Sequence, residues 1–310
     1  MAAGRLALAV PMLFVVATAT FFLQRLVPGD PGSFILGNQA PPAEIRQFDN
    51  SLGLSRPLLA QYASWLGRAV RGDFGSSWVT HAPVTATLLS AAPITLSLAL
   101  LVVLLIVPAA IALGTAAALR RGLLDRAFQA IAGVAIALPN FWLGVGLVLF
   151  LAVDLRVFPA TGYTGLSDPA QWLRSLVLPV LALGLGPMMG LALQVRGAMI
   201  DELSKDYVRS LRAAGLPRRA VLFRHVLRNT MPPVVTTIGF QIIGLLAGAV
   251  VIEQLFNLPG LGTLLVTGVS SHDVPLVQGV VLLLAGVVVA VNLMTDIAVA
   301  VLNPKSRGQA

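Results

Sequence analysis

The chain has 310 residues, of which 57% are hydrophobic and 11% are charged, and its formal net charge is +8. Soluble globular proteins contain about 25% charged residues, so this chain has too little polar surface to cover a water-soluble globule. The absence of cysteine excludes a disulfide-stabilised secreted scaffold, and the high apolar content excludes a disordered chain. The composition therefore predicts an all-α integral membrane protein.

Six stretches are long and apolar enough to cross a membrane, since about 20 helical residues span a hydrocarbon core of roughly 30 Å. They are residues 6–23, 93–119, 130–153, 176–195, 234–252 and 274–302. The first stretch has a second interpretation as a cleaved signal peptide, because Arg5 precedes it and Ala17-Thr18-Ala19 is similar to a cleavage site. Its apolar run continues to Leu23, however, which favours a membrane helix.

The distribution of Lys and Arg predicts the orientation, because cytoplasmic loops are enriched in both. With six alternating spans and the N-terminus inside, the inner segments contain 14 basic and 4 acidic residues, whereas the outer segments contain 7 basic and 8 acidic residues. We therefore expect both termini to be cytoplasmic. Because topology accounts for most of the positive charge, nothing in the charge pattern indicates nucleic-acid binding.

The first long connection, residues 28–92, is expected outside the membrane. Pro and Gly in segment 28–32 predict the end of the first helix. Ser55 and Pro57 are typical of an N-cap followed by an early-turn proline, and apolar residues then recur at helical spacing as far as Gly72. The pattern predicts an amphipathic helix. This helix either caps the outer helix ends or forms a docking surface for an external partner.

The second long connection, residues 196–230, is expected inside. Its charges predict a solvated helix leaving the membrane, followed by a small-residue patch at 213–215 and a break at Pro217. We expect a second helix from this break to Pro232 and Pro233. Small side chains permit close approach to a partner groove, although such a patch is also typical of an ordinary turn between helices.

Segment 206–215, followed by 224–229 and the two prolines, resembles the cytoplasmic "EAA" loop of ABC importer permeases. Within this family, the segment is most similar to the oligopeptide/dipeptide branch, and there to the first of the two permease subunits. Further matching pieces cover nearly the whole chain in the same order: PGDP at 28–31, LGLSRP at 52–57, QY at 61–62, RGDFGSS at 71–77, LPNFWLG at 138–144, FPATGY at 158–163, EQLFNLPGLG at 253–262 and DVPLVQG at 273–279. Two positions depart from the family pattern. Arg209 replaces the acidic residue of the general loop, and Asn-Pro-Lys at 303–305 stands where Asp-Pro-Arg is expected.

The resemblance implies a type I ABC importer permease fold and a permease that moves di- or oligopeptides across the cytoplasmic (inner) membrane of a bacterium. The implied partners are a second homologous permease subunit, two cytoplasmic ATPase subunits, an extracytoplasmic substrate-binding protein and membrane lipid. The chain contains no G-x-x-x-x-G-K-[ST] motif, so ATP and Mg are expected in the ATPase subunits, with no catalytic residue, cofactor or metal here. Similar permeases serve nickel chelates, glutathione or haem, which leaves the cargo open.

The resemblance also implies a division of the chain. Residues 1–92 form the first helix and the external loop, 93–303 the transmembrane domain with its coupling loop at 196–230, and 304–310 a cytoplasmic tail. The residues expected to couple the permease to the ATPase subunits, centred on segment 207–216, are Asp206, Tyr207, Arg209, Arg212, Ala213, Ala214, Gly215 and Leu216.

Polar residues within the spans are expected to face the bundle interior, because exposure to hydrocarbon is costly. The candidates for the translocation path are Gln194, Gln241, Gln278, Asn292 and Asp296. Asn292 and Asp296, four residues apart on one helix face, have a second interpretation as an interhelical clamp. The candidates for an external gate or loop anchor are Glu253, Phe256, Pro259, Gly260, Gly262 and Asp273.

Two other classes compete. An ion-coupled secondary transporter needs buried ionisable residues near mid-membrane, and only Asp296 lies clearly within a predicted span. An intramembrane enzyme needs a catalytic constellation, but the chain has neither H-E-x-x-H nor G-x-S-x-G. His81, His225 and His272 are all expected in loops, and we expect His225 to meet a partner surface.

Overall fold

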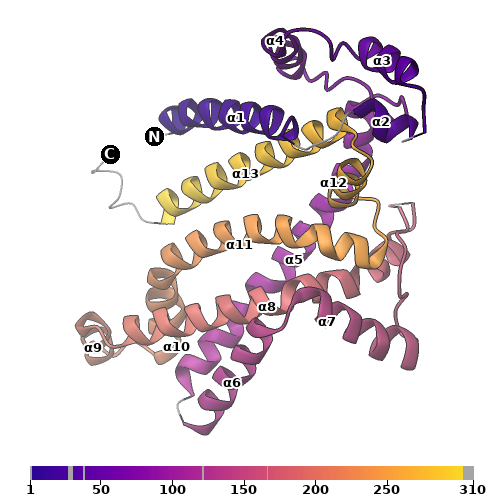
Figure 1. The fold of residues 1–310 in the computed structure, drawn as a ribbon. Helices are drawn as coiled ribbons and strands as arrows, with labels where there is room; N and C mark the ends of the chain where they lie inside the picture. The colour runs from indigo at the N-terminus through magenta and orange to yellow at the C-terminus, as the bar shows by residue number, and fades with distance from the viewer. Residues whose placement is uncertain (1, 27–30, 38, 121, 166, 303–310) are drawn as a thin grey trace. The chain divides into compact units, whose positions relative to one another are not determined.

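The computed structural model describes residues 2–26, 31–37, 39–120, 122–165 and 167–302. The expected helix stop at Pro28 and the expected tail at 304–310 lie outside these residues. The described chain is helical apart from turns and one isolated β-bridge between Ser76 and Pro83. In chain order the helices are α1 (Ala2–Gln24), α2 (Pro31–Leu36), α3 (Pro42–Ser51), α4 (Leu58–Ala69), α5 (Val84–Leu119), α6 (Leu123–Ala137), α7 (Asn140–Leu147), the π-helical η1 (Val148–Asp154), α8 (Pro169–Leu203), α9 (Asp206–Ala213), α10 (Arg218–Ala220), the π-helical η2 (Val221–Val226), α11 (Leu227–Phe256), α12 (Leu261–Ser270) and α13 (Val274–Leu302) (Figure 1).

The helices form two compact units. One comprises Ser97–Asn257 and the part of α13 from Ala290 onward, and the other comprises Ala2–Leu96 and Leu258–Val289. We call the first the inner-loop unit, because it contains the connection 196–230, which is expected on the cytoplasmic side of the membrane. We call the second the N-terminal unit, because it contains α1. The long helices α5 and α13 each contribute residues to both.

Four described helices are long and apolar enough to cross a membrane, namely Val84–Leu119, Pro169–Leu203, Arg218–Phe256 and Val274–Leu302. The predicted spans 93–119, 176–195, 234–252 and 274–302 lie within these four helices. The predicted first span, 6–23, lies in α1, whose part with described side chains, Ala9–Gln24, is a shorter apolar helix.

The stretch 130–153, predicted as one span, is broken. Helix α6 and the continuous α7–η1 helix meet at a bend of 100°. Leu138 at the bend has an extended backbone with φ −77° and ψ 128°. A proline disfavours helical geometry in the residue before it, and Pro139 cannot donate a backbone hydrogen bond. The dipeptide Leu138-Pro139 therefore interrupts the span.

The helix expected to end at Pro232 and Pro233 instead continues through both, so this prediction is wrong. Helices α10, η2 and α11 form one continuous apolar helix from Arg218 to Phe256. Pro-containing membrane helices persist where other groups satisfy the disturbed backbone. Pro232 and Pro233 remove the helical donors to the carbonyls of Arg228 and Asn229, and both of those residues are exposed.

In the N-terminal unit, α4 is the amphipathic helix predicted before Gly72, which follows it with φ +79°. Trp65 of α4 is buried against Ala17 and Phe21 of α1. The predicted N-cap at Ser55 is wrong, because the helix begins at Leu58 without a side-chain cap. The short helices α2, α3 and α12 are not anticipated by the sequence analysis.

In the inner-loop unit, α8 packs against α6, α7 and α11, and a glycine brings α5 close to it. A Cβ atom on Gly114 of α5 would lie 2.4 Å from the carbonyl oxygen of Ala192 and 2.8 Å from the Cβ of Val195. Small residues at such crossings let membrane helices approach closely. The α5–α8 contact therefore requires glycine at position 114.

Replacing Gly114 by Ala is expected to destabilise the protein, although alanine favours helix by about 1 kcal/mol. Overpacking against a backbone oxygen costs roughly 1–3 kcal/mol and outweighs that gain. The midpoint of heat-induced loss of monodisperse protein in detergent should fall by about 2 °C or more. Gly133→Ala is the matched control, because nothing lies within 4 Å of a Cβ at that helical glycine. Equal midpoints for the two variants would contradict the close approach.

Candidate functional site

The loop between α8 and α11 is organised around α9. Lys205 before it is extended, and Gly215 after it has φ +82°, a left-handed conformation that glycine adopts without a steric penalty. The amide of Leu216 donates to the carbonyl of Leu211 at 3.2 Å, which closes the turn after the helix. Pro217 is extended and precedes α10. The predicted break at Pro217 is confirmed.

One face of α9 is buried in the apolar core of the inner-loop unit. Val208 is fully buried in a cluster that includes Met199 of α8 and Val226 of η2. Tyr207, Leu211 and Leu216 pack against the same cluster and are partly buried. Each fully buried side chain of this kind contributes about 1.5–3 kcal/mol, so this face holds α9 onto α8 and η2.

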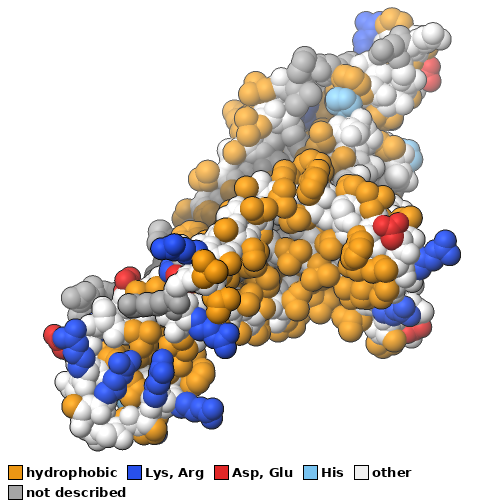
Figure 2. All heavy atoms as spheres, turned by 90° about the horizontal axis from the view of Figure 1, so that it is seen from below, with side chains coloured by type: hydrophobic (Ala, Val, Ile, Leu, Met, Phe, Trp, Pro, Cys, Tyr) orange, Lys and Arg blue, Asp and Glu red, His pale blue; other side chains and the backbone are white. Residues whose placement is uncertain are grey.

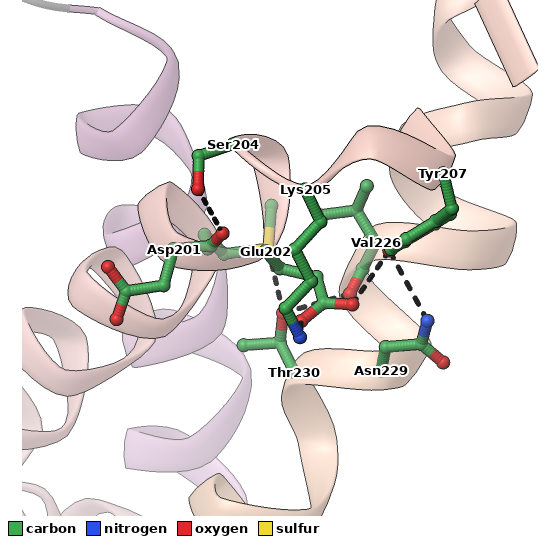
Figure 3. Close-up of polar contacts among 9 residues, drawn as sticks. Asp201, Glu202, Ser204, Lys205, Tyr207, Val226, Asn229 and Thr230 are labelled. Carbon is green, nitrogen blue, oxygen red and sulfur yellow. Dashed lines mark hydrogen bonds and ion pairs between the residues drawn. The ribbon is translucent and has the colours of Figure 1, made fainter. Parts of the chain in front are cut away.

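A polar network adds to the apolar contact and joins three helices (Figure 3). Glu202, near the end of α8, is 7% exposed, and one of its oxygens accepts from Lys205 Nζ at 2.5 Å. The hydroxyl of Tyr207 in α9 donates to the other carboxylate oxygen at 2.8 Å. Asn229 Nδ2 of α11 donates to the same tyrosine oxygen at 3.3 Å. Tyr207 is thus the point at which α8, α9 and α11 meet through hydrogen bonds.

The buried carboxylate makes the network sensitive to loss of a partner. Burial and the hydrogen bond to Glu202 both raise the pKa of Tyr207, so its phenol is a protonated donor at neutral pH. Removing one partner of a buried charge lowers the folding stability by more than the intact pair contributes to it, because the remaining group is left buried and unpaired. Glu202 and Asn229 were not among the expected site residues. In the sequence Glu202 is one of three acidic residues in a mainly basic loop, beside Asp201 and Asp206, and nothing distinguishes it from them.

The opposite face of α9 and the following turn are exposed. They present Ala213, Ala214 and Gly215 together with an exposed ion pair, in which Arg209 Nη1 lies 3.4 Å from Asp206 Oδ1. Figure 2 shows Lys and Arg side chains gathered in the part of the molecule that contains α9 and α10. The exposed arginines of this loop and of the first turns of the next helix are Arg209, Arg212, Arg218, Arg219, Arg224 and Arg228. This surface suits a partner that has a narrow groove and negative charge.

The structure places two of the five path candidates at the contact between α8 and α11. Gln241 of α11 donates to the Pro187 carbonyl of α8 at 3.0 Å, and Gln194 of α8 donates to the Pro233 carbonyl of α11 at 3.4 Å. These reciprocal bonds connect the two helices. The other three candidates are on α13, where Gln278 is buried in the N-terminal unit and Asn292 and Asp296 are partly buried in the inner-loop unit.

The candidates for an external gate occupy helix ends. Asp273 is 1% exposed and precedes α13, where it accepts hydrogen bonds from the Ser77 hydroxyl, from Trp78 N at 3.2 Å and from Leu276 N at 3.4 Å. It therefore fastens the loop before α5 to the start of α13. The remaining candidates are Glu253 and Phe256, both buried at the end of α11, and Pro259, Gly260 and Gly262 around the start of α12, of which Pro259 is exposed.

The histidines form no metal centre. Among the described residues, no group of three or more His, Cys, Asp or Glu could hold a metal ion. His81 and His272 lie in loops as predicted, and the His272 ring stacks on Phe34 with a centroid distance of 3.7 Å. His225 lies in η2 and not in a loop, because the helix begins seven residues earlier, at Arg218.

Comparisons with known proteins cover nearly the whole chain. Residues 106–308 match the binding-protein-dependent transport system inner membrane component family, and residues 3–99 match the N-terminal part of such membrane components. A Brucella abortus (strain 2308) protein, provisionally named a peptide transport system permease protein, is 38% identical over 305 residues, covering 98% of this chain and 97% of that one. The di/tripeptide transport system permease protein DppB of Pseudomonas aeruginosa (strain UCBPP-PA14) is 36% identical, covering 99% and 98%. The glutathione transport system permease protein GsiC of Salmonella choleraesuis (strain SC-B67) is 37% identical, covering 96% and 95%.

Replacing Tyr207 by Phe is expected to loosen α9 without unfolding the protein. The change removes the hydroxyl between Glu202 and Asn229, and a hydrogen bond to a charged group contributes about 1.5–3 kcal/mol, so backbone amide exchange in α9 should accelerate by roughly 10–100-fold. Hydrogen–deuterium exchange with mass spectrometry measures this directly. Tyr163→Phe is the control, because Tyr163 accepts a hydrogen bond from Trp172 Nε1 outside this loop. If α9 exchanged at the wild-type rate in both variants, the network would not be holding it.

Proposed function

This chain belongs to the binding-protein-dependent transport system inner membrane component family, and from this premise we propose that it is the permease subunit of an ATP-driven peptide importer. It is a multi-pass protein of the bacterial inner membrane. The observation that supports the proposal most directly is α9, a helix with one face fixed to the transmembrane helices and the other face free of described contacts.

The attachment of α9 makes it suitable for transmitting force. Val208 and the Glu202–Tyr207 bond fix it to α8, and Asn229 links it to α11. Both of these helices are long enough to cross the membrane. A displacement of α9 by a partner would therefore move two membrane helices together. We propose that segment 207–216 is the coupling segment, with Asp206, Arg209, Arg212 and the small residues facing the partner.

The source of energy is proposed to lie in other subunits. The chain has no phosphate-binding loop motif, so two cytoplasmic ATPase subunits would bind ATP and Mg and engage α9. A second, homologous permease subunit would complete the pathway, and an extracytoplasmic binding protein would deliver cargo. The exposed arginines of the inner loop favour an acidic surface on the ATPase subunit.

We further propose six spans with both termini in the cytoplasm. In this arrangement α1 and the bent α6–η1 pair each count as one span beside the four long helices. The division into residues 1–92, 93–303 and 304–310 belongs to the same proposal. It is supported by the excess of Lys and Arg in the segments assigned to the inside.

Peptide is the cargo favoured by the relatives, whose names specify peptides, di- and tripeptides and glutathione. Glutathione remains the second candidate because a relative with 37% identity bears that name. The roles of the path and gate candidates are also proposals. The path candidates remain Gln194, Gln241, Gln278, Asn292 and Asp296, of which Gln194 and Gln241 also bond to backbone carbonyls between α8 and α11.

Replacing Gly215 by Arg tests the coupling segment. We expect the variant to insert normally, to lose ATP-driven peptide uptake in membrane vesicles, and to lose or uncouple the associated ATPase activity. Gly215→Ala is the control, since it introduces the same left-handed strain, about 1 kcal/mol, without the bulk. Wild-type uptake by Gly215→Arg would reject the assignment. Equal loss in both variants would mean that backbone strain, and not contact with a partner, causes the defect.

The proposed topology can be tested with single cysteines, because the chain contains none. Ser210→Cys in α9 and Ser51→Cys at the end of α3 replace exposed serines. In right-side-out vesicles a membrane-impermeant maleimide should label Ser51→Cys alone, and in inverted vesicles Ser210→Cys alone. Labelling of both variants from the same side would contradict the topology.

A further inference from the structure

The N-terminal unit contains a cavity of 380 Å³ whose lining residues, apart from the path candidate Gln278, have no role in the proposals above. It is enclosed by the end of α1, the turn before α4, one face of α4, segment 74–78 and the start of α13. Small-molecule sites occupy about 300–1,000 Å³, so this cavity is large enough for a short peptide end and too small for a folded partner.

Among the described residues, the charged groups that line this cavity all have one sign. Arg25, Arg56 and Arg68 line it, together with His81, and no described lining residue is an aspartate or glutamate. Within the described ranges none of the three arginines forms an ion pair with a carboxylate. Burial lowers the pKa of Arg25, which means that its charge is placed there at a cost. The described lining of the cavity therefore offers these guanidinium groups no complementary carboxylate.

Two glutamines shape the cavity. Gln61 accepts a hydrogen bond from Arg25 Nη2 and donates from Nε2 to the carbonyls of Leu54 and Arg56 at 2.9 and 2.8 Å, so it holds Arg25 and the turn before α4 in place. Gln278 of α13 is only 3% exposed and lines the cavity. Trp65 Nε1, on another lining residue, is a buried donor with no hydrogen-bond partner among the described residues. A ligand that accepts a hydrogen bond from this indole would satisfy the donor.

Four aromatic residues also line the cavity, namely Phe21, Trp65, Phe74 and Trp78. A ligand that fits this combination has a carboxylate for the guanidinium groups and an apolar part for the rings. We propose that this cavity binds the free carboxylate end of a short peptide on the outer side of the membrane. The proposal rests on the proposed peptide-importer function and adds a peptide site on the permease itself.

The test uses the complete importer complex, purified without its binding protein in nanodiscs of zwitterionic phosphatidylcholine. Equilibrium binding of radiolabelled alanyl-alanine is measured in competition with unlabelled alanyl-alanine, its C-terminal amide and inorganic phosphate. Arg68→Gln and Arg56→Gln remove a charge from the cavity. Arg71→Gln is the matched control, because this exposed arginine lies three residues further along and does not line the cavity.

We expect the free acid to compete at least about tenfold better than the amide, since a charge-assisted hydrogen bond contributes about 1.5–3 kcal/mol. Arg68→Gln and Arg56→Gln should each weaken binding by roughly the same factor, and Arg71→Gln should leave it unchanged. Equal competition by acid and amide, or by inorganic phosphate, would overturn the proposal. The proposal would also be overturned if the complex bound no alanyl-alanine and the cavity arginines were needed only for docking of the binding protein.

Failure of this proposal and failure of the proposed function give different results. With the binding protein restored, ATP-driven import of peptide by a wild-type complex that shows no saturable binding of alanyl-alanine would reject only the cavity site. Absence of import for every peptide tested would reject the peptide-importer function.

Discussion

The attachment of α9 to α8 and α11 is the contact on which the proposed coupling of this permease depends. Val208 contributes the apolar part of it, and Glu202 contributes a buried carboxylate that is stable only while Lys205 and Tyr207 both bond to it. Because Asn229 of α11 binds the same tyrosine, the network joins residues near both ends of the connection 196–230. A short helix is marginal in isolation, so α9 owes its order to this anchoring. Its outer face is then free to present small side chains and positive charge.

The helices to which α9 is attached are themselves closely packed. Gly114 allows α5 to approach α8, and on the far side of the unit a Cβ on Gly239 of α11 would lie 2.4 Å from Thr295 Oγ1 of α13. Side-chain bonds from Gln194 and Gln241 run between α8 and α11 in both directions. In lipid, packing and hydrogen bonds of this kind replace the hydrophobic driving force that holds soluble bundles together. The unit can therefore move as a body when α9 is displaced.

The sequence predicted the membrane class, the amphipathic α4 and the break at Pro217, because apolar run length, helical periodicity and Pro-Gly turns are local signals. It predicted a span over 130–153 without the bend at Pro139. It also predicted a helix end at Pro232, which is wrong. In the first case Pro139 holds Leu138 in an extended conformation and bends the span. In the second case the packed helix continues through both prolines. The Glu202 network and the arginine cavity could not be predicted, because their members meet only after folding. Gln278 was recognised as an unusual polar residue in a span, but the cavity it lines is formed by residues far from it in the sequence.

If α9 couples this permease to separate ATPase subunits, those subunits should be isolated with it. The chain would be affinity-purified from its native membrane in several mild detergents, and every co-purifying protein identified. We expect two ATPase subunits and a second, similar permease. A chain that is purified alone in every detergent, and whose Asp296→Asn variant loses proton-coupled uptake, would reject the coupling role of α9 and favour an ion-coupled transporter instead.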